Sequence, residues 1–398
     1  TEEGILKPVV TRDIYSMING VPMGTQPVSM YPHWTERWDG EDKTSWLWVA
    51  QKGGQGAIDI SGSSYKQEGI LSQMFLSKSY PEGFVSVGVI DMQFLTMAIG
   101  EDGTIYTRVK DSNLLFNSSN FLDRPLTSDK EGKIKVDGSM IAYAPFDEHG
   151  GMVLYDKNSA QYLHIADYKN WQGYNYSGKV LPLKVEEYEY GPSDARLDNM
   201  KDYSVYFVGA SLVDWGDISY MSIIKDKAGK FYMQKFKVEA YGGGSSVTKV
   251  GASFISQSEI KGLDAVIDGT SKNCFYLCRN QDKAPYLFIS KGETLYFYYT
   301  DGNKLYTCAQ FDSPIASIDA ECFNNKYIIV GLESGDVFIL KGEDDNSDYT
   351  LKKYVIQQNK VIQVTDAENK FVLFHEKDFG KIIQVRYKWK ESWNESFS

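Results

Sequence analysis

Few residues in this 398-residue chain have the types and spacing that catalysis requires. The four histidines are His33, His149, His164 and His375. None of them forms the H-x-x-x-H pair that binds zinc on a helix. The segment GASLV at 209–213 misses the nucleophile elbow, because Val213 stands where the motif requires glycine. The histidines and this segment therefore give no catalytic constellation.

Two acidic segments supply oxygen atoms instead. Glu186, Glu187 and Glu189 could provide a carboxylate pair for glycoside hydrolysis, although their polar surroundings predict a solvated loop. Residues 344–348 follow a D-x-N-x-D spacing, as in a calcium loop. Tyr349 stands where an EF-hand needs glycine, and we expect a loop between strands there. We therefore expect no catalytic residue, no metal ion and no cofactor.

Aromatic residues make up 14% of the chain and gather in a few segments. Rings on loops offer a flat surface for sugar faces or peptide side chains. The rings that we assign to loops and expect to contact ligand are Trp34, Trp38, Trp171, Tyr174 and Trp215. Asp39, Asp214 and Asp217 lie near them in sequence and could accept hydrogen bonds from hydroxyls. The alternative is packing inside the fold, which we expect for Trp46 and Trp48, two residues apart in a strand.

The elements that must position these rings are β-hairpins. Residues 327–330 and 337–340 are apolar runs joined by a turn in which Gly335 suits a positive φ. Both faces of these strands should be covered, in the middle of a sheet. Similar hairpins recur with turns centred at residues 56, 103, 159, 229, 292 and 380. A second turn signal, TDGN at 300–303, leaves room for an additional unit between 230 and 290.

These turns recur roughly every 40–70 residues, with several strands in each interval, a pattern typical of a β-propeller. We predict a single all-β propeller domain over residues 1–398, with about seven blades, six or eight being possible. Closing such a ring requires the ends of the chain to share a sheet. We therefore expect residues near 5–10 to pair within the sheet that contains residues 369–389.

Composition excludes some partners. The net charge of −11 and the pI near 5.0 argue against nucleic acid, whose phosphates need a cationic footprint. No apolar stretch approaches 18 residues, so we expect no transmembrane segment. The cysteines are Cys274, Cys278, Cys308 and Cys322. Cys274 and Cys278 lie too far apart along one strand to pair, and we expect buried thiols, with a bridge through Cys308 or Cys322 as the alternative.

The segment SWLWVAQKGGQGAIDI at 45–60 resembles the first hairpin of PKD-like family lipoproteins of the Bacteroidetes. GETLYFYYTDGNKLYTC at 292–308 resembles the later repeats of that family, whereas Ser45 departs from it, where the family pattern has glycine. The resemblance implies a surface protein whose lipoprotein signal and small PKD- or immunoglobulin-like domain precede residue 1. It also implies a gene beside those for an outer-membrane uptake system.

We therefore expect a non-catalytic binding module on the cell surface, lipid-anchored to the outer membrane. Its expected partners are a glycan or peptide ligand and the proteins of a nutrient-uptake system. Two alternatives remain: a protein–protein interaction scaffold, because propellers offer rigid multi-loop faces, and a propeller-fold glycoside hydrolase or polysaccharide lyase.

Overall fold

The structure is a computed structural model. It describes residues 9–11, 13–24, 26–35, 44–110, 120–129, 131–143, 150–169, 173, 175–214, 217–241, 250–277, 286–300, 302–320, 327–341, 372–373 and 384–386. The described chain is all-β, as predicted. Its helices are α1 (Ile14–Asn19) and the 3-10 helices η1 (Leu71–Met74), η2 (Glu187–Glu189) and η3 (Leu263–Ala265). None of these helices has the length and apolar character needed to cross a membrane.

Successive segments of the chain form successive sheets, whose strands run antiparallel. The first sheet contains β2 (Pro27–Thr35), β3 (Thr44–Gln51), β4 (Ile58–Ser61) and β5 (Gln67–Ile70). The second contains β6 (Ser86–Asp91), β7 (Leu95–Gly100) and β8 (Ile105–Val109). A further four-stranded sheet contains β17 (Phe275–Leu277), β18 (Tyr286–Lys291), β19 (Thr294–Tyr299) and β20 (Lys304–Gln310). The last four-stranded sheet contains β21 (Ile315–Ala320), β22 (Tyr327–Leu332), β23 (Asp336–Lys341) and β24 (Val372–Leu373).

Between these sheets lies one of eight strands, made of two antiparallel groups. The first group is β9 (Ile141–Tyr143), β10 (Gly151–Asp156), β11 (Gln161–Ala166) and β12 (Val180–Lys184). The second is β13 (Tyr203–Asp214), β14 (Asp217–Asp226), β15 (Phe231–Tyr241) and β16 (Val250–Glu259). A short parallel pairing of β12 with β16, at Leu183 with Val250 and Lys184 with Gly251, joins them.

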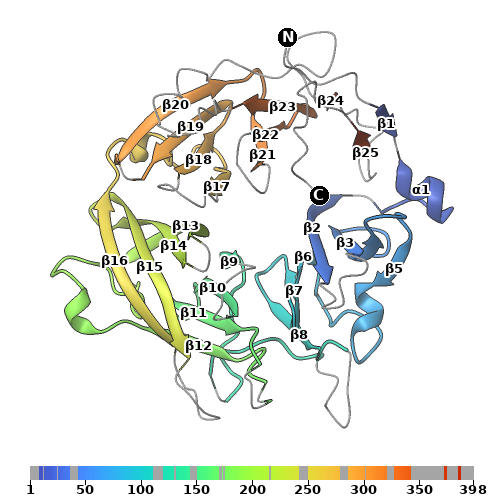
Figure 1. The fold of residues 1–398 in the computed structure, drawn as a ribbon, viewed down its shortest axis with the longest axis horizontal. Coiled ribbons are helices and arrows are strands. Elements are labelled where there is room, and N and C mark those ends of the chain that lie inside the picture. Colours follow the sequence, from blue (N-terminus) through green and yellow to red (C-terminus); the bar gives the residue numbers. More distant parts are fainter. Residues whose placement is uncertain are drawn as a thin grey trace.

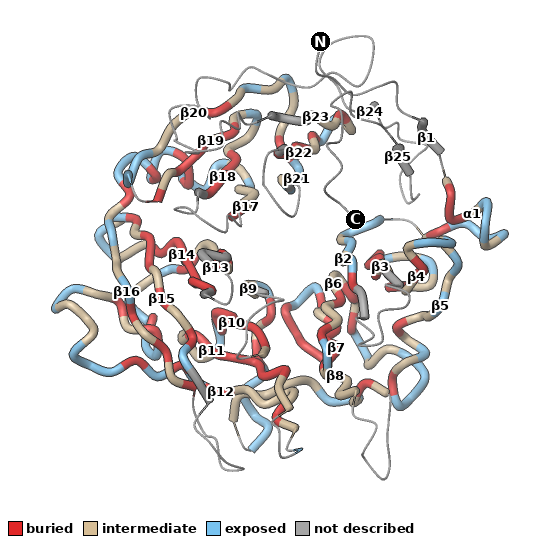
Figure 2. Tube along the Cα trace, viewed as in Figure 1, coloured by how far each residue is buried: buried red, intermediate tan, exposed pale blue. Residues whose placement is uncertain are grey.

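The strand groups follow one another around a ring in chain order (Figure 1). Separate apolar clusters fill the spaces between neighbouring groups: Trp48 and Val89 belong to one, and Leu95 and Leu163 to the next. Buried positions accordingly lie along the strands, while exposed ones concentrate in the connections (Figure 2). The core is thus a series of layers between sheets rather than one central cluster.

The two ends of the described chain pair with each other, as predicted, but residues 369–389 do not belong to a single sheet, because β24 pairs with β23 in another one. Strand β1 (Val9–Thr11) lies antiparallel to β25 (Gln384–Arg386), with Val10 opposite Val385. This pairing removes one free edge from each strand.

The predicted hairpin turns are confirmed wherever the structure describes them. Gly56, Gly103, Gly229, Gly292 and Gly335 all have a positive φ between consecutive strands. The turn near Ser159 uses its neighbour, since Ala160 takes a φ of 51°. The turn centred at residue 380 lies outside the described residues.

The two competing turn signals near residue 300 belong to one sheet. Gly292 joins β18 to β19, and Asn303, with a φ of 46°, joins β19 to β20. Among the described residues between 230 and 290, strands β15 and β16 belong to the eight-stranded sheet and β17 and β18 to the next. The described part of this interval therefore holds no additional sheet.

The hairpin at 327–341 is central in its sheet, as predicted, because β22 pairs with both β21 and β23. Ile328 and Val330 are fully buried, and Ile329 is half-buried. Consecutive apolar residues of this strand are thus covered on both faces. Coverage is more complete along β10, where all six residues are buried.

Candidate functional site

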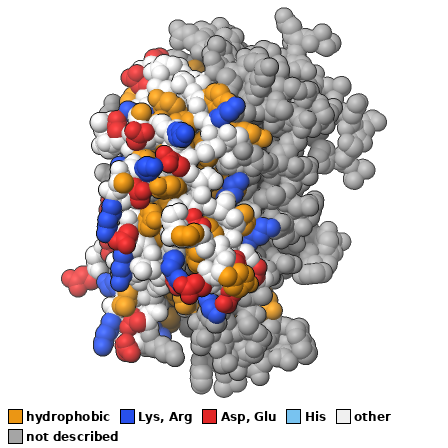
Figure 3. Space-filling view, turned by 90° about the vertical axis from the view of Figure 1, so that its left-hand side faces the viewer, with side chains coloured by type: hydrophobic (Ala, Val, Ile, Leu, Met, Phe, Trp, Pro, Cys, Tyr) orange, Lys and Arg blue, Asp and Glu red, His pale blue; other side chains and the backbone are white. Residues whose placement is uncertain are grey.

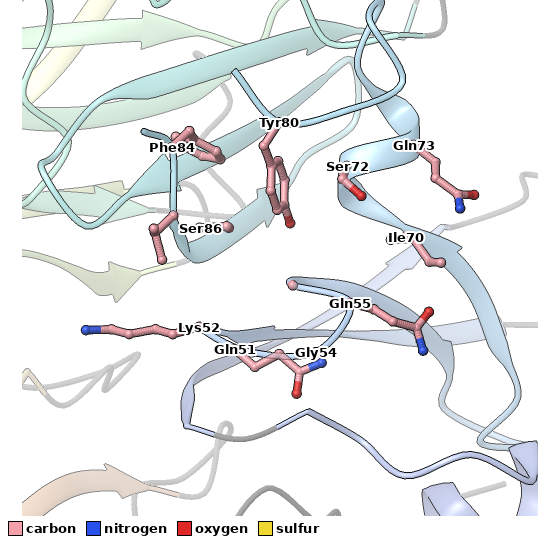
Figure 4. Close-up of a pocket in the computed structure, with 12 residues that line it drawn as sticks. Gln51, Lys52, Gly54, Gln55, Ile70, Ser72, Gln73, Tyr80, Phe84 and Ser86 are labelled. Carbon is pink, nitrogen blue, oxygen red and sulfur yellow. The ribbon is translucent and has the colours of Figure 1, made fainter. Parts of the chain in front are cut away.

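A pocket with a volume of about 390 Å³ opens between the first and second sheets. Its lower side in Figure 4 comes from the end of β3 and the link to β4, and its upper side from the segment between η1 and β6. The described residues that line it are Gln51, Lys52, Gly54, Gln55, Gly56, Ile70, Ser72, Gln73, Tyr80, Phe84, Val85 and Ser86. This volume lies within the range of roughly 300–1,000 Å³ that is usual for small-molecule sites.

Glycines give the lower side of the pocket its shape. Gly54 and Gly56 have φ angles of +64° and +75°, which L side chains rarely adopt. Gly24 packs against the same link, since a Cβ built on it would lie 2.5 Å from the carbonyl oxygen of Gly53. The glycines of the predicted turn centred at residue 56 therefore have a steric role, and this turn forms one side of the pocket.

Aromatic rings form the opposite wall. Tyr80 and Phe84 meet edge to face with ring centroids 5.4 Å apart, and both contact the buried Phe75. The backbone N–H of Ala57 donates to the Tyr80 hydroxyl at 3.0 Å, which ties this wall to β4. Burial raises the pKa of Tyr80 to about 12, so its hydroxyl stays neutral near pH 7.

The polar groups of the pocket are mainly uncharged amides and hydroxyls. Gln51 is buried, and its Oε1 atom has no hydrogen-bond partner. The side chain of Gln55 is positioned by Gln67, which does not line the pocket: Nε2 of Gln67 donates to Oε1 of Gln55 at 3.1 Å. The ammonium group of Lys52 pairs with Glu101 at the rim. The described lining residues include no Asp, Glu, His or Cys.

The aromatic residues selected from the sequence are only partly placed. Trp38, Trp171, Tyr174 and Trp215 lie outside the described residues. Trp34 was predicted to lie in a loop, and this prediction is wrong: its backbone belongs to β2 and pairs with Ser45. The sequence around Trp34 is rich in polar residues and Pro, but backbone pairing with β3 overrides that composition.

Of the acidic residues near those rings, some are described by the structure and one is not. Asp39 lies outside the described residues. Asp214 and Asp217 are strand residues, which pair with each other where β13 ends and β14 begins. Most members of the predicted aromatic platform therefore lie outside the described residues, and the platform stays a prediction.

Trp46 and Trp48 do share a face, as predicted, and His33 lies against both. The His33 ring stacks on Trp46 at 5.6 Å and on Trp48 at 6.2 Å. Its Nε2 atom lies 3.1 Å from Oδ1 of Asp59, and its Nδ1 atom lies 3.3 Å from Oδ2 of Asp91. Sequence reasoning missed this cluster, because His33 comes opposite Trp46 only through the pairing of β2 with β3.

The cluster continues into a network of buried charges between the second and third strand groups. Lys110 Nζ lies 2.6 Å from Asp91 Oδ1, and the Thr96 hydroxyl donates to the same oxygen at 2.8 Å. Asp167, which follows β11, accepts from the backbone N–H groups of Gln93 and Phe94 at 2.9 and 2.8 Å. This network holds neighbouring sheets together, and it lines no described pocket.

The other candidates from the sequence have structural partners. Glu187 pairs with Arg196, and Glu189 accepts from the backbone N–H of Phe254 at 2.9 Å, so both carboxylates are engaged within the fold. Within the described parts of the chain, no group of three or more His, Cys, Asp and Glu could hold a metal ion. Residues 344–348 lie outside those parts.

Two cysteines are placed, and both are free thiols. Cys274 is half-buried, and Cys308 is buried in the core between the β17–β20 and β21–β24 sheets. Burial raises the pKa of the Cys308 thiol to about 12, so it stays protonated. Cys278 and Cys322 lie outside the described residues.

Comparison with known proteins gives no relative: neither a family model nor a curated protein matches this sequence.

Proposed function

We propose that the strand groups are the blades of a seven-bladed β-propeller. Six groups, from β2–β5 to β21–β24, succeed one another in the chain when the eight-stranded sheet is divided at its short parallel pairing. The β1–β25 pair would belong to the seventh blade. The layered clusters between neighbouring groups support this reading, because propeller blades pack face to face around an axis.

We propose that this propeller is a non-catalytic binding module for a glycan or peptide. The observation that carries the proposal is the pocket between the first two sheets, with its wall of aromatic rings and its mainly uncharged polar lining. Its described lining contains no carboxylate or imidazole for acid–base chemistry, so it favours binding over the glycoside hydrolase alternative.

A place on the cell surface, with a lipid anchor and outer-membrane uptake proteins as partners, is the setting that we propose for this module. The hairpin at 45–60, which resembles that of the PKD-like lipoproteins, supports it. The same hairpin supplies Gln51, Lys52, Gly54, Gln55 and Gly56 of the pocket, so the segment that carries the resemblance also carries the site.

An array of glycans and peptides, probed with the chain and with a variant whose pocket is filled, tests this function. Ser72 lines the pocket, and Ser72→Trp should abolish capture of every specific ligand. Ser258→Trp, at an exposed position on β16, is the matched control and should bind as the unmodified chain does. Capture that survives Ser72→Trp would place the site elsewhere, and the absence of any specific capture would refute the function.

A further inference from the structure

A row of ionisable side chains crosses the first three strand groups. Oδ1 of Asp59 on β4 lies 3.1 Å from Nε2 of His33 on β2, and Oδ2 of Asp91 on β6 lies 3.3 Å from Nδ1 of the same ring. Lys110 Nζ lies 2.6 Å from Oδ1 of Asp91, and the charge of Lys110 also acts on Asp167. The charges along this row alternate in sign throughout only if His33 carries a proton on each nitrogen.

The position of the His33 ring favours this protonated form. A neutral imidazole has a single N–H, so its other nitrogen presents a lone pair to a negative oxygen when both nitrogens have carboxylate neighbours. An imidazolium is attracted by both carboxylates instead. The side chains of His33 and Asp91 are 9% exposed and that of Asp59 is 15% exposed, so water screens these charges only weakly.

The tryptophan rings beside His33 add a second favourable term for a cation. Trp46 and Trp48 stack on the ring with interplanar angles of 20° and 21°. The centroid distance to Trp46, 5.6 Å, lies within the limit of about 6 Å for attraction between a cation and the face of an indole. A positive ring is therefore stabilised by its aromatic neighbours as well as by its carboxylates.

The remaining charged groups around this ring leave room for one more cation. Arg108 on β8 is near enough for the charges of Asp91 and Asp59 to act on it. Burial raises the pKa of Asp167 to about 6, so this carboxyl is mostly ionised at pH 7. The three carboxylates then outnumber the two permanent cations, Arg108 and Lys110, by one among the described neighbours. An imidazolium balances that charge.

We propose that His33 is an imidazolium in the folded protein at neutral pH, and that its proton holds the first sheet to the second. Histidine is the side chain whose charge changes near neutral pH, whereas lysine and arginine keep theirs. Loss of the proton as the pH rises would leave Asp59 and Asp91 against an uncharged ring. The contact between the two sheets that enclose the pocket would then weaken. This inference concerns the packing of the sheets and is independent of the ligand.

NMR titration of the chain labelled with ¹³C at histidine Cε1 tests the protonation of His33. The His33 signal is the one that disappears in His33→Gln or, if that variant does not fold, the one that moves in Asp59→Asn. At pH 7.5 we expect this signal at the position of an imidazolium, whereas the peptide acetyl-Gly-His-Gly-amide is mostly uncharged there. A signal at the position of a neutral imidazole at pH 7.5 would overturn the proposal.

The role of the carboxylates has its own matched pair of variants. Asp59→Asn removes one negative neighbour and should move the midpoint of the His33 titration to lower pH. Asp202→Asn removes an exposed carboxylate that pairs with Lys227, and it should leave that midpoint unchanged. Equal midpoints in the two variants would mean that Asp59 does not hold the proton on His33.

Urea unfolding of the unmodified chain and of His33→Gln, from pH 6.5 to pH 9, tests whether the proton holds the sheets together. A proton bound more tightly in the folded state contributes stability that is present at low pH and is lost as the pH rises. The unfolding constant of the unmodified chain, divided by that of the variant, should therefore increase about tenfold over this range. Asp167 titrates in both proteins and cancels in the ratio. A ratio that does not change with pH would overturn the role of the proton in joining the sheets.

Discussion

At the scale of single residues, the largely buried carboxylate of Asp91 contacts more polar groups than a surface ion pair does. It contacts His33, Lys110 and Thr96, and it is only 9% exposed. Asp91→Asn would leave Lys110 and His33 without its charge. We expect the free energy of unfolding in urea to fall by about 2 kcal/mol or more, because a partner of a buried charge is left uncompensated.

Asp202→Asn is the matched control for Asp91→Asn. Asp202 pairs with Lys227, and both side chains are exposed. Such surface pairs contribute roughly 0–1 kcal/mol. Equal losses in the two variants would show that the network around Asp91 adds nothing beyond a surface ion pair.

Asp167 gives a prediction about pH. Burial raises its pKa to about 6, although the backbone N–H groups of Phe94 and Gln93 and the charge of Lys110 act in the opposite direction. The proton is therefore held more tightly in the folded state than in the unfolded state. The stability that this group contributes is fully present below pH 4 and is lost as the pH rises through about 6.

Asp167→Asn, which cannot titrate, provides the reference for this effect. From pH 4 to pH 7.5 the free energy of unfolding of the unmodified chain should fall relative to that of the variant, by about 3 kcal/mol at most. Urea titrations of both proteins at matched pH values measure the difference. A difference that stays constant over this range would contradict the raised pKa.

At the scale of elements, the hairpin turns depend on backbone conformation. Gly335 has a φ of 88° between β22 and β23. Gly335→Val should lower the free energy of unfolding by about 1 kcal/mol or more, since a β-branched residue is poorly accommodated there. Glu333→Val, at an exposed position of the same turn, is the control and should cost less. Similar melting temperatures for the two variants would mean that the positive φ costs nothing.

The hairpins that turn at a glycine were predictable because each one carries its own signal: two apolar runs and a residue that accepts a positive φ. The site was less predictable. The sequence predicts the turn centred at residue 56, but Tyr80 and Phe84 reach the same pocket from a separate segment. Nothing in the local pattern of either segment indicates that they meet. The prediction that Trp34 lies in a loop was wrong for a related reason, since its strand is defined by pairing with β3 and not by its own composition.

At the scale of the whole molecule, the surface charge is mixed. On the face over β16, Lys and Arg side chains are interspersed with Asp and Glu (Figure 3). Pairs such as Lys230 with Glu259 belong to this pattern. Together with the net charge of −11, this arrangement offers a phosphate backbone no continuous cationic stripe among the described residues of that face.

Pairing of the two ends of the chain is a property of the whole molecule, because it joins segments from opposite ends of the sequence. Val10 and Val385 lie opposite each other in the β1–β25 pair, although 375 positions separate them in sequence. Cysteines at both positions, Val10→Cys with Val385→Cys, should form a disulfide on oxidation. Joining positions so distant restricts the unfolded chain, and we expect a gain of about 2–4 kcal/mol in the free energy of unfolding.

The control is the pair Val10→Cys with Val372→Cys, which places the second cysteine in β24, a strand that pairs with β23. Mass spectrometry of peptides after oxidation identifies the bond, and it separates this bond from any that involves the native cysteines. The 10–385 bond should form readily in the folded protein and raise the melting temperature, whereas the control should stay reduced. If the 10–385 bond forms only after unfolding, or if both pairs oxidise equally, the two ends of the chain do not share a sheet, and the ring is not closed by β1 and β25.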